Sequence, residues 1–179
     1  MTGLIIIGYQ GIGKSSLGTM DSANQNIIDF ESRLFEVDGD RANNWHVIYC
    51  RQAVSLAKAG FIVLVSSHKC VREELAKYDQ DDFVIVTIIP SPKLKEEWIA
   101  RLKDRYLQDP SEKNVLALQN AENSYDEDIK DISSDPNFSH IYLESTNYHL
   151  RSIINKLYKI FNSIDSRFYY RGTDTDSDS

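Results

Sequence analysis

The sequence has few cysteines, no excess of basic residues and no long apolar run, and each shortage excludes a class of protein. Its two cysteines, Cys50 and Cys70, and its four scattered histidines lack metal-ligand spacing, which argues against a disulfide framework and a zinc site. No apolar run approaches the roughly 20 residues that a membrane-spanning helix needs, and we expect no signal peptide. The composition therefore predicts a cytoplasmic protein without a membrane partner.

The charge balance is acidic, with a formal net charge of −7. Proteins that coat nucleic acid usually have a basic surface, so this charge argues against a nucleic-acid partner. Part of the negative charge lies in "GTDTDSDS", residues 172–179, which has no apolar side chain to bury. We expect residues 172–179 to form a disordered acidic tail and residues 1–171 to form one domain.

Short apolar runs alternate with helix-like segments along the chain. Strands are predicted at 4–8, 26–30, 61–67, 83–89 and 140–145. Helices are predicted at 14–22, from Asn43 or Asn44 to Ala59, at 70–78, from Pro92 to about Tyr106, at 111–130 and at 148–164. This alternation predicts an α/β fold with a mainly parallel, doubly wound sheet. In the helix that ends before Gly60, we expect one inward stripe formed by Trp45, Ile48, Tyr49, Ala53 and Leu56.

Residues 8–15, GYQGIGKS, match the pattern G-x-x-x-x-G-K-[ST] at every fixed position, between a predicted strand and a predicted helix. Backbone N–H groups of such a loop point at phosphate oxygens, and the helix dipole favours the same anion. Lys14 would reach the β- and γ-phosphates, and the Ser15 hydroxyl would hold Mg²⁺. The sequence therefore predicts a P-loop that binds ATP and Mg²⁺. The expected nucleotide-binding residues are Gly8, Gln10, Gly11, Ile12, Gly13, Lys14, Ser15 and Ser16.

A P-loop alone does not separate kinases from GTPases, motor ATPases or regulatory proteins. The sequence contains no N-K-x-D segment of the kind that reads guanine, and no run of four apolar residues that ends in Asp-Glu. The third predicted strand ends instead in Ser66, Ser67 and His68. These absences favour a kinase.

Further segments carry polar residues that resemble those of known kinases. "IIDFES" places Asp29 and Glu31 at the end of the second strand, and looks like the D-x-[DE] pair of shikimate-type kinases. "DGDRANNW" and "VSSHKCVREEL" resemble the D-D-R-x-x-W and S-A-L-K-x-x-Y-R segments of gluconate kinase, which makes Arg41 and Arg72 candidate acceptor-site cations. "WIARLKDRY" resembles an R-x-x-x-R lid helix, with Arg101 and Arg105 on one face.

The chain thus resembles the small P-loop kinases, a group that includes nucleoside monophosphate kinases, shikimate kinase and gluconate kinase. The resemblance implies a three-layer P-loop kinase fold with a five-stranded, mainly parallel sheet and a helical lid. It implies catalytic roles for Lys14, Arg101, Arg105 and Asp29, and a Mg²⁺ site at Ser15 and Asp29. The implied acceptor-site residues are Asp29, Glu31, Arg33, Arg41 and Arg72. Such a site works by positioning and by cations around the transferred group, with a lid that excludes water.

The leading functional prediction is ATP-dependent phosphoryl transfer to a nucleoside or deoxynucleoside monophosphate. An acceptor phosphate would explain the otherwise unmatched Arg33, Arg41 and Arg72, and compact kinases of this kind resemble phage-encoded enzymes of nucleotide metabolism. The alternatives are a gluconate- or shikimate-like kinase with a hydroxyl acceptor, a kinase that acts on nucleic acid, and a nucleotide-binding regulatory protein without turnover. Monomer and homodimer both remain open.

Structural roles compete with several of these assignments. Arg101 and Arg105 could pair with Glu97 and Asp104 on a solvated helix, and Asp29 could cap the next turn. Arg41 could be structural as well. The fold resemblance alone places adenine between the lid side and residues 145–147.

Overall fold

The computed structural model describes residues 3–17, 27–37 and 40–169 of the 179-residue chain. The predicted acidic tail and the predicted helical residues 18–22 lie outside this part. Within it, no helix combines the length and the apolar composition that crossing a membrane would require.

Five parallel strands form the central sheet, in the order β2-β5-β1-β6-β7. They are β1 (Gly3–Gly8), β2 (Ile27–Asp29), β5 (Ile62–Ser66), β6 (Phe83–Pro90) and β7 (Ser139–Leu143). The first strand lies in the middle, where Ile6 is opposite Leu64 on one side and Val86 on the other. This arrangement confirms the predicted α/β fold with a parallel sheet.

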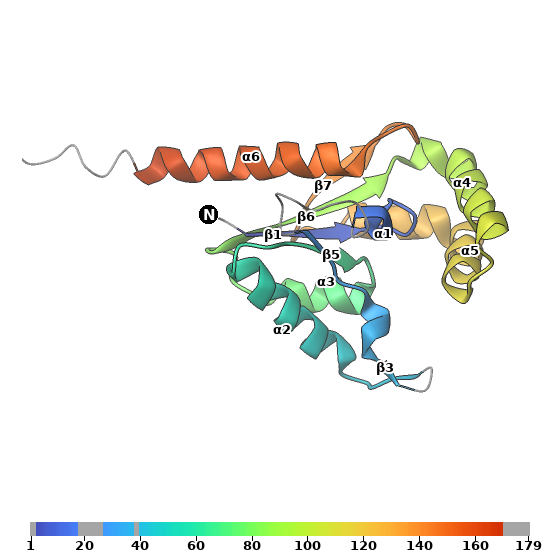
Figure 1. Cartoon of the computed structure of the whole chain (residues 1–179), viewed down its shortest axis with the longest axis horizontal. Helices are drawn as coiled ribbons and strands as arrows, with labels where there is room; N and C mark the ends of the chain where they lie inside the picture. Colours follow the sequence, from blue (N-terminus) through green and yellow to red (C-terminus); the bar gives the residue numbers. More distant parts are fainter. Residues whose placement is uncertain (1–2, 18–26, 38–39, 170–179) are drawn as a thin grey trace, which may run out of the picture.

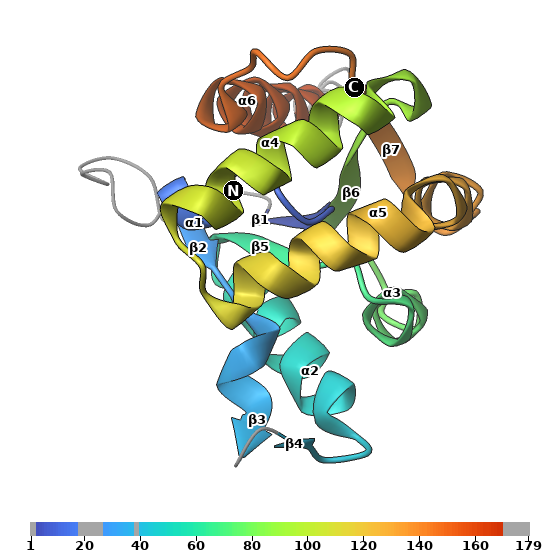
Figure 2. The same ribbon diagram turned by 90° about the vertical axis from the view of Figure 1, so that its right-hand side faces the viewer.

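Helices cover both faces of the sheet, so the molecule has three layers (Figure 1). They are α1 (Lys14–Leu17), α2 (Trp45–Lys58), α3 (Lys69–Leu75), α4 (Lys95–Gln108), α5 (Glu112–Ser133) and α6 (Leu150–Tyr169), with short 3₁₀ turns η1 (Ser32–Phe35) and η2 (Pro92–Leu94). Helices α2 and α3 lie on one side of the sheet and α6 on the other (Figure 1). Helices α4 and α5 cross in front of the carboxyl ends of the strands (Figure 2). Because parallel strands present their functional ends at one edge, these two helices border the expected site.

The hydrophobic core has two parts, one on each face of β1. Leu4 and Ile6 pack with residues of α4, α5 and α6, whereas Ile5 and Ile7 pack with α2 and α3. Every residue of β1 is therefore buried, which explains why the strand is a continuous apolar run rather than an alternating one.

Helix α2 differs from the predicted stripe, because Ile48 is 43% exposed and the buried face runs through Cys50, Ala53 and Ala57. The buried face extends to Ala57 because the backbones of α2 and β1 approach each other closely there: a Cβ added at Gly3 would lie 1.8 Å from the Ala57 carbonyl oxygen.

Two local features depart from the sequence pattern. A small antiparallel hairpin, β3 (Glu36–Val37) with β4 (Asp40–Arg41), follows η1 and was not predicted. Strands this short carry no hydrophobic period that sequence reading could detect. Ser91 makes no side-chain cap, and the turn η2 precedes α4, which begins at Lys95 rather than at Pro92.

We predict that Gly3→Ala lowers the free energy of unfolding by about 3 kcal/mol, because the added methyl group would overlap the backbone of α2. Urea denaturation followed by circular dichroism measures the change. Ser55→Ala, at an exposed position of the same helix, should change stability by no more than about 0.5 kcal/mol. Equal stability of the Gly3 variant and the wild type would contradict this packing.

Candidate active site

The P-loop joins β1 to α1 and needs its glycines for two reasons. Gly11 and Gly13 have φ angles of 83° and 94°, which side-chain-bearing residues rarely adopt. A Cβ on Gly11 would also lie 2.8 Å from the Leu102 Cδ2 atom of α4. The loop thus follows the tight path expected for a phosphate cradle and packs directly against α4.

Aromatic donors hold the P-loop from outside. Trp98 Nε1 donates to the Gln10 carbonyl at 3.0 Å, and the Tyr148 hydroxyl donates to the Ile12 carbonyl at 2.8 Å. The two rings are parallel to within 4°, with centroids 6.3 Å apart. Trp98 is fully buried. Helix α4 and the segment after β7 therefore fix the loop before any ligand arrives.

Lys14 lies at the start of α1 and turns back toward the sheet. Its Nζ donates to the carbonyls of Gly8 at 2.5 Å and Val65 at 3.4 Å. Burial lowers the pKa of Lys14 to about 8, and the nearby Asp29 carboxylate acts against this shift. The ammonium group is therefore held at the base of the loop, where phosphate oxygens would compensate its burial.

A cavity of about 470 Å³ extends from the P-loop along the strand ends. It brings together most of the predicted site residues. It is lined by Gln10, Gly11, Ile12, Gly13, Lys14, Ser15, Asp29, Phe30, Glu31, Ser32, Arg33, Glu36, Arg41, Ser66, His68, Arg105, Lys113, Leu116, Ala117 and Asn120. The predicted phosphate loop and four of the five predicted acceptor residues thus share one space.

Asp29 ends β2 and faces this cavity. Burial raises the pKa of its carboxyl group, and the charge of Lys14 opposes the shift. Tyr49 links the carboxyl ends of β2 and β5. Its hydroxyl donates to the Phe30 carbonyl at 2.6 Å and accepts from the Ser66 N–H at 3.0 Å. The sequence placed Tyr49 in the core but gave no sign of this bridging role.

Arg41 extends from the β3–β4 hairpin and lines the first cavity. It pairs with Glu36 at 2.6 Å, donates to the Ser32 hydroxyl at 3.2 Å and lies 4.5 Å from the centroid of the Trp45 ring. Its Nε atom is buried and finds no partner among the described residues. Arg33, nearby on η1, pairs with Glu112 of α5 at 3.1 Å.

Arg101 and Arg105 project from α4 to different places. Arg105 borders both the first cavity and a second one of about 760 Å³, which Arg101 and Thr146 also line. Arg101 donates to the Thr146 carbonyl at 3.0 Å and lies over the rings of Trp98 and Tyr148. The second cavity therefore reaches the segment where adenine is expected. Because Trp98 and Leu102 of the same helix are buried, α4 is anchored to the P-loop.

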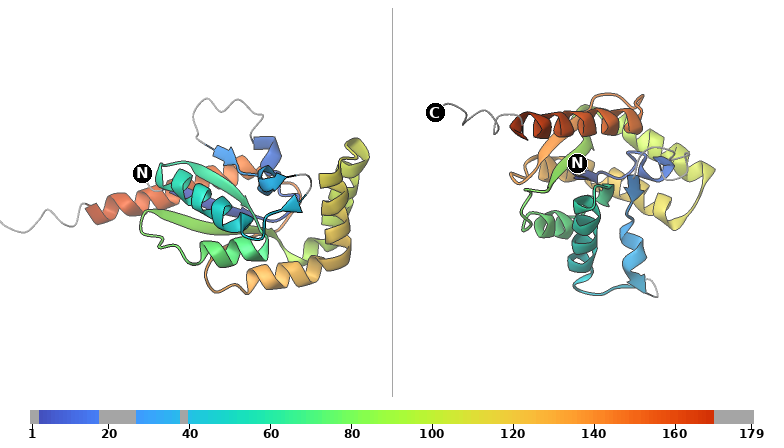
Figure 3. Two further views of the ribbon diagram at one scale, coloured as in Figure 1. Left: turned by 90° about the horizontal axis from the view of Figure 1, so that it is seen from below. Right: turned by 60° about the vertical axis from the view of Figure 1, so that its left-hand side comes forward.

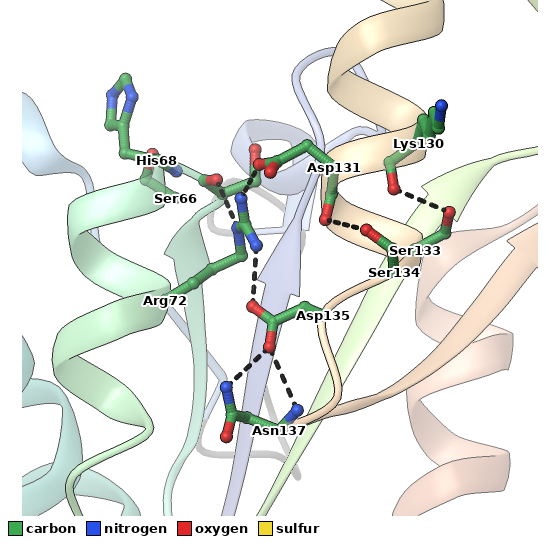
Figure 4. A network of polar contacts seen from close by, with 10 residues as sticks. Ser66, His68, Arg72, Lys130, Asp131, Ser133, Ser134, Asp135 and Asn137 are labelled. Carbon is green, nitrogen blue, oxygen red and sulfur yellow. Dashed lines mark hydrogen bonds and ion pairs between the residues drawn. The ribbon is translucent and has the colours of Figure 1, made fainter.

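Arg72 does not line either cavity. Its buried guanidinium pairs with Asp131 and, at 2.7 Å, with Asp135, and its Nε donates to the Ser67 carbonyl at 3.3 Å (Figure 4). This network joins α3 to the end of α5 (Figure 4). Two carboxylates already neutralise Arg72. Arg72 is therefore not among the residues that we propose to bind the acceptor, although the sequence predicted this role.

The carboxylates and the P-loop hydroxyl supply the oxygen ligands that Mg²⁺ prefers. Ser15, Asp29 and Glu31 line one wall of the first cavity. Among the described residues, no group of three or more His, Cys, Asp and Glu side chains could form a metal site on its own. A Mg²⁺ ion usually keeps several waters and binds one or two carboxylates plus substrate phosphates, so this donor set fits it.

Among the comparisons with known proteins, the one with solved structures identifies the architecture. No protein-family model matches the sequence, and no curated protein matches it. A gluconokinase from Sinorhizobium meliloti is similar in structure, with a TM-score of 0.53 and 13% identity over 96% of this chain and 97% of that one. A shikimate kinase from Acinetobacter baumannii, solved with shikimate, has a TM-score of 0.51 and 16% identity over 91% of this chain and 94% of that one. The chain therefore has the fold of the small P-loop kinases.

We predict that nucleotide affinity falls as the pH rises past about 8, where Lys14 loses its proton in the ligand-free chain. The dissociation constant of a non-hydrolysable ATP analogue with Mg²⁺ should rise by up to about tenfold per pH unit above that value. Isothermal titration calorimetry between pH 7.5 and 9.5 measures it. Lys14→Met should bind weakly without this slope, and a flat profile in the wild type would refute the assignment.

We predict that Arg72→Met costs about 3 kcal/mol of unfolding free energy, because it leaves the largely buried Asp135 without its cation. Thermal and urea denaturation provide the measurement. Lys58→Met breaks an exposed pair with Asp82 and should cost less than about 1 kcal/mol. Equal stability of the two variants would show that the ion pairs of Arg72 do not stabilise the fold.

Proposed function

We propose that this chain is an ATP-dependent kinase that phosphorylates a hydroxyl group of a small anionic acceptor. The observation that carries the proposal is the shared cavity, in which the P-loop, Asp29 and Arg41 line one continuous space. A donor phosphate on the P-loop and an acceptor beside Arg41 would meet near Asp29. Phosphoryl transfer requires this kind of positioning more than any covalent chemistry from the protein.

The residues that line the two cavities would share the work of the proposed reaction, and Asp29 would contact both the metal ion and the acceptor. Lys14 and the loop amides would hold the β- and γ-phosphates, while Ser15 with Asp29 and Glu31 would hold Mg²⁺, which supplies charge neutralisation. The raised pKa of Asp29 suits a carboxylate that orients an acceptor hydroxyl and accepts its proton. Arg105 lies between the two cavities, where it would stabilise charge on the transferred group.

A hydroxy acid is the acceptor class that we favour. The chain is similar in fold to a gluconokinase and to a shikimate kinase with shikimate bound. The sequence-based argument for a nucleotide acceptor rested on Arg33, Arg41 and Arg72, yet all three have carboxylate partners. The buried Nε of Arg41 still lacks a partner among the described residues, and a carboxylate would supply one.

A nucleoside or deoxynucleoside monophosphate is the second candidate acceptor. Arg33 and Arg41 line the same cavity, and Phe30 gives it an aromatic wall on which a base could pack. A polar phosphate could displace Glu36 and Glu112 from the two guanidinium groups. This alternative retains the nucleotide-metabolism role that the sequence favoured.

We predict that the protein consumes ATP with Mg²⁺ in the presence of a hydroxy acid such as gluconate or shikimate. A coupled assay for ADP with these acids and with all nucleoside monophosphates tests this. Asp29→Asn should lower kcat by about 10²- to 10⁴-fold, because the group that orients and deprotonates the hydroxyl is lost.

Matched variants separate the possible outcomes. Asp82→Asn changes an exposed carboxylate and should retain full activity, while Lys14→Ala should abolish turnover. Conversion of a monophosphate but of no hydroxy acid would select the second candidate. Tight ATP binding without turnover on any acceptor would favour a regulatory nucleotide-binding protein over a kinase.

A further inference from the structure

The ammonium group of Lys113 lies among the oxygen atoms that we expect to bind the metal ion. It lies in the first turn of α5, and its Nζ donates to the Ser15 hydroxyl at 3.2 Å. The same Nζ forms an ion pair with the Glu31 carboxylate. Ser15 and Glu31 are thus joined through one ammonium group, although they lie on different elements. No motif in the sequence marks Lys113.

The backbone around Lys113 is held in place. The buried side chain of Asn114 donates to the Asp109 carbonyl at 2.8 Å and to the Asp109 carboxylate at 3.0 Å. On the other side, Glu112 pairs with Arg33 of η1. Lys113 is therefore presented to the P-loop by a fixed turn between α4 and α5, and differs from a lysine on a free surface.

Charged groups from several elements border the cavity around this ammonium group. Asp29 at the end of β2 and Glu31 just after it are negative, whereas Lys14 of α1 and Arg105 of α4 are positive. Lys113 and Lys14 both lower the pKa of Asp29, against the larger effect of burial. A divalent cation that reached Ser15 and Glu31 would meet Lys113 at the same oxygens, and two cations this close repel each other.

We propose that Lys113 is a built-in competitor of the metal ion, which occupies the Ser15–Glu31 position until the metal–nucleotide complex displaces it. The inference rests on the proposed function for the identity of the metal site. In the nucleotide-free chain, Lys113 compensates the Glu31 charge and keeps a free divalent ion from binding. The triphosphate then offers Lys113 new partners, so that metal and nucleotide enter together.

Binding of Mn²⁺ to the nucleotide-free protein tests the proposal without any turnover. Free Mn²⁺ is measured by electron paramagnetic resonance for the wild type, Lys113→Met and Lys113→Arg, and for Lys103→Met as an exposed control on α4. Lys113→Met should bind Mn²⁺ about fivefold more tightly than the wild type, since it removes one half-exposed competing pair. Lys113→Arg and Lys103→Met should stay within about twofold of the wild type.

A double variant tests whether the gain in Mn²⁺ affinity arises at the site beside Ser15. Ser15→Ala in the Lys113→Met background should remove the added affinity, which excludes Mn²⁺ binding at other acidic residues. Circular dichroism establishes that each variant is folded. Unchanged or weaker Mn²⁺ binding by Lys113→Met overturns the proposal, as does a gain that survives Ser15→Ala.

A second arm separates this inference from the proposed function. Mn²⁺ is titrated again in the presence of a non-hydrolysable ATP analogue, and the Mn²⁺ that the analogue binds without protein is measured separately and subtracted. Tight Mn²⁺ binding by the wild type in this arm, with no gain for Lys113→Met in the first, refutes the competitor and leaves the kinase proposal standing. Absence of Mn²⁺ binding in both arms, for every variant, refutes both. A gain in the first arm supports the competitor even if no acceptor is phosphorylated.

Discussion

The attachment of the P-loop to α4 is the constraint on which the rest of the site depends. The indole of Trp98 satisfies a loop carbonyl, and Leu102 packs where a side chain at position 11 would lie. These contacts set the distance between the phosphate cradle and the arginines of α4. Helix α5 packs against α4 and brings Lys113 to Ser15. A single packed helix therefore coordinates the donor loop, the arginines and the cation that borders the metal position.

Charge pairing is the second organising principle. Arg33, Arg41 and Lys113 all line the first cavity, and each pairs with a carboxylate: Glu112, Glu36 and Glu31 respectively. An incoming anion must exchange with these carboxylates, so binding replaces one ion pair by another rather than neutralising a bare charge. Selection among acceptors then depends on geometry and on hydrogen bonds that the resident carboxylates cannot make. The buried Nε of Arg41 is one such place.

The sequence predicted the five strands of the central sheet, the sheet type and the P-loop because each leaves a local signal. A continuous apolar run such as residues 4–8 indicates a strand buried on both faces, and the spacing of Gly8, Gly13, Lys14 and Ser15 is specific. Arg72 could not be assigned in this way, since its partners Asp131 and Asp135 lie about sixty residues further along the chain. The contacts that Lys113 and Tyr49 make in the site were not predicted either, because they are tertiary contacts with Ser15 and Phe30. Long-range pairing of side chains leaves no periodicity to detect.

The β3–β4 hairpin forms a sheet of its own and, together with η1, stands beside α2 and apart from α6 (Figure 3). Its Arg41 and Glu36 line the cavity, whereas the P-loop depends on β1, α4 and the segment after β7. The two ends of the cavity are thus built from separate structural modules. In the proposed kinase, mutations in the hairpin would therefore alter the choice of acceptor without disturbing the P-loop.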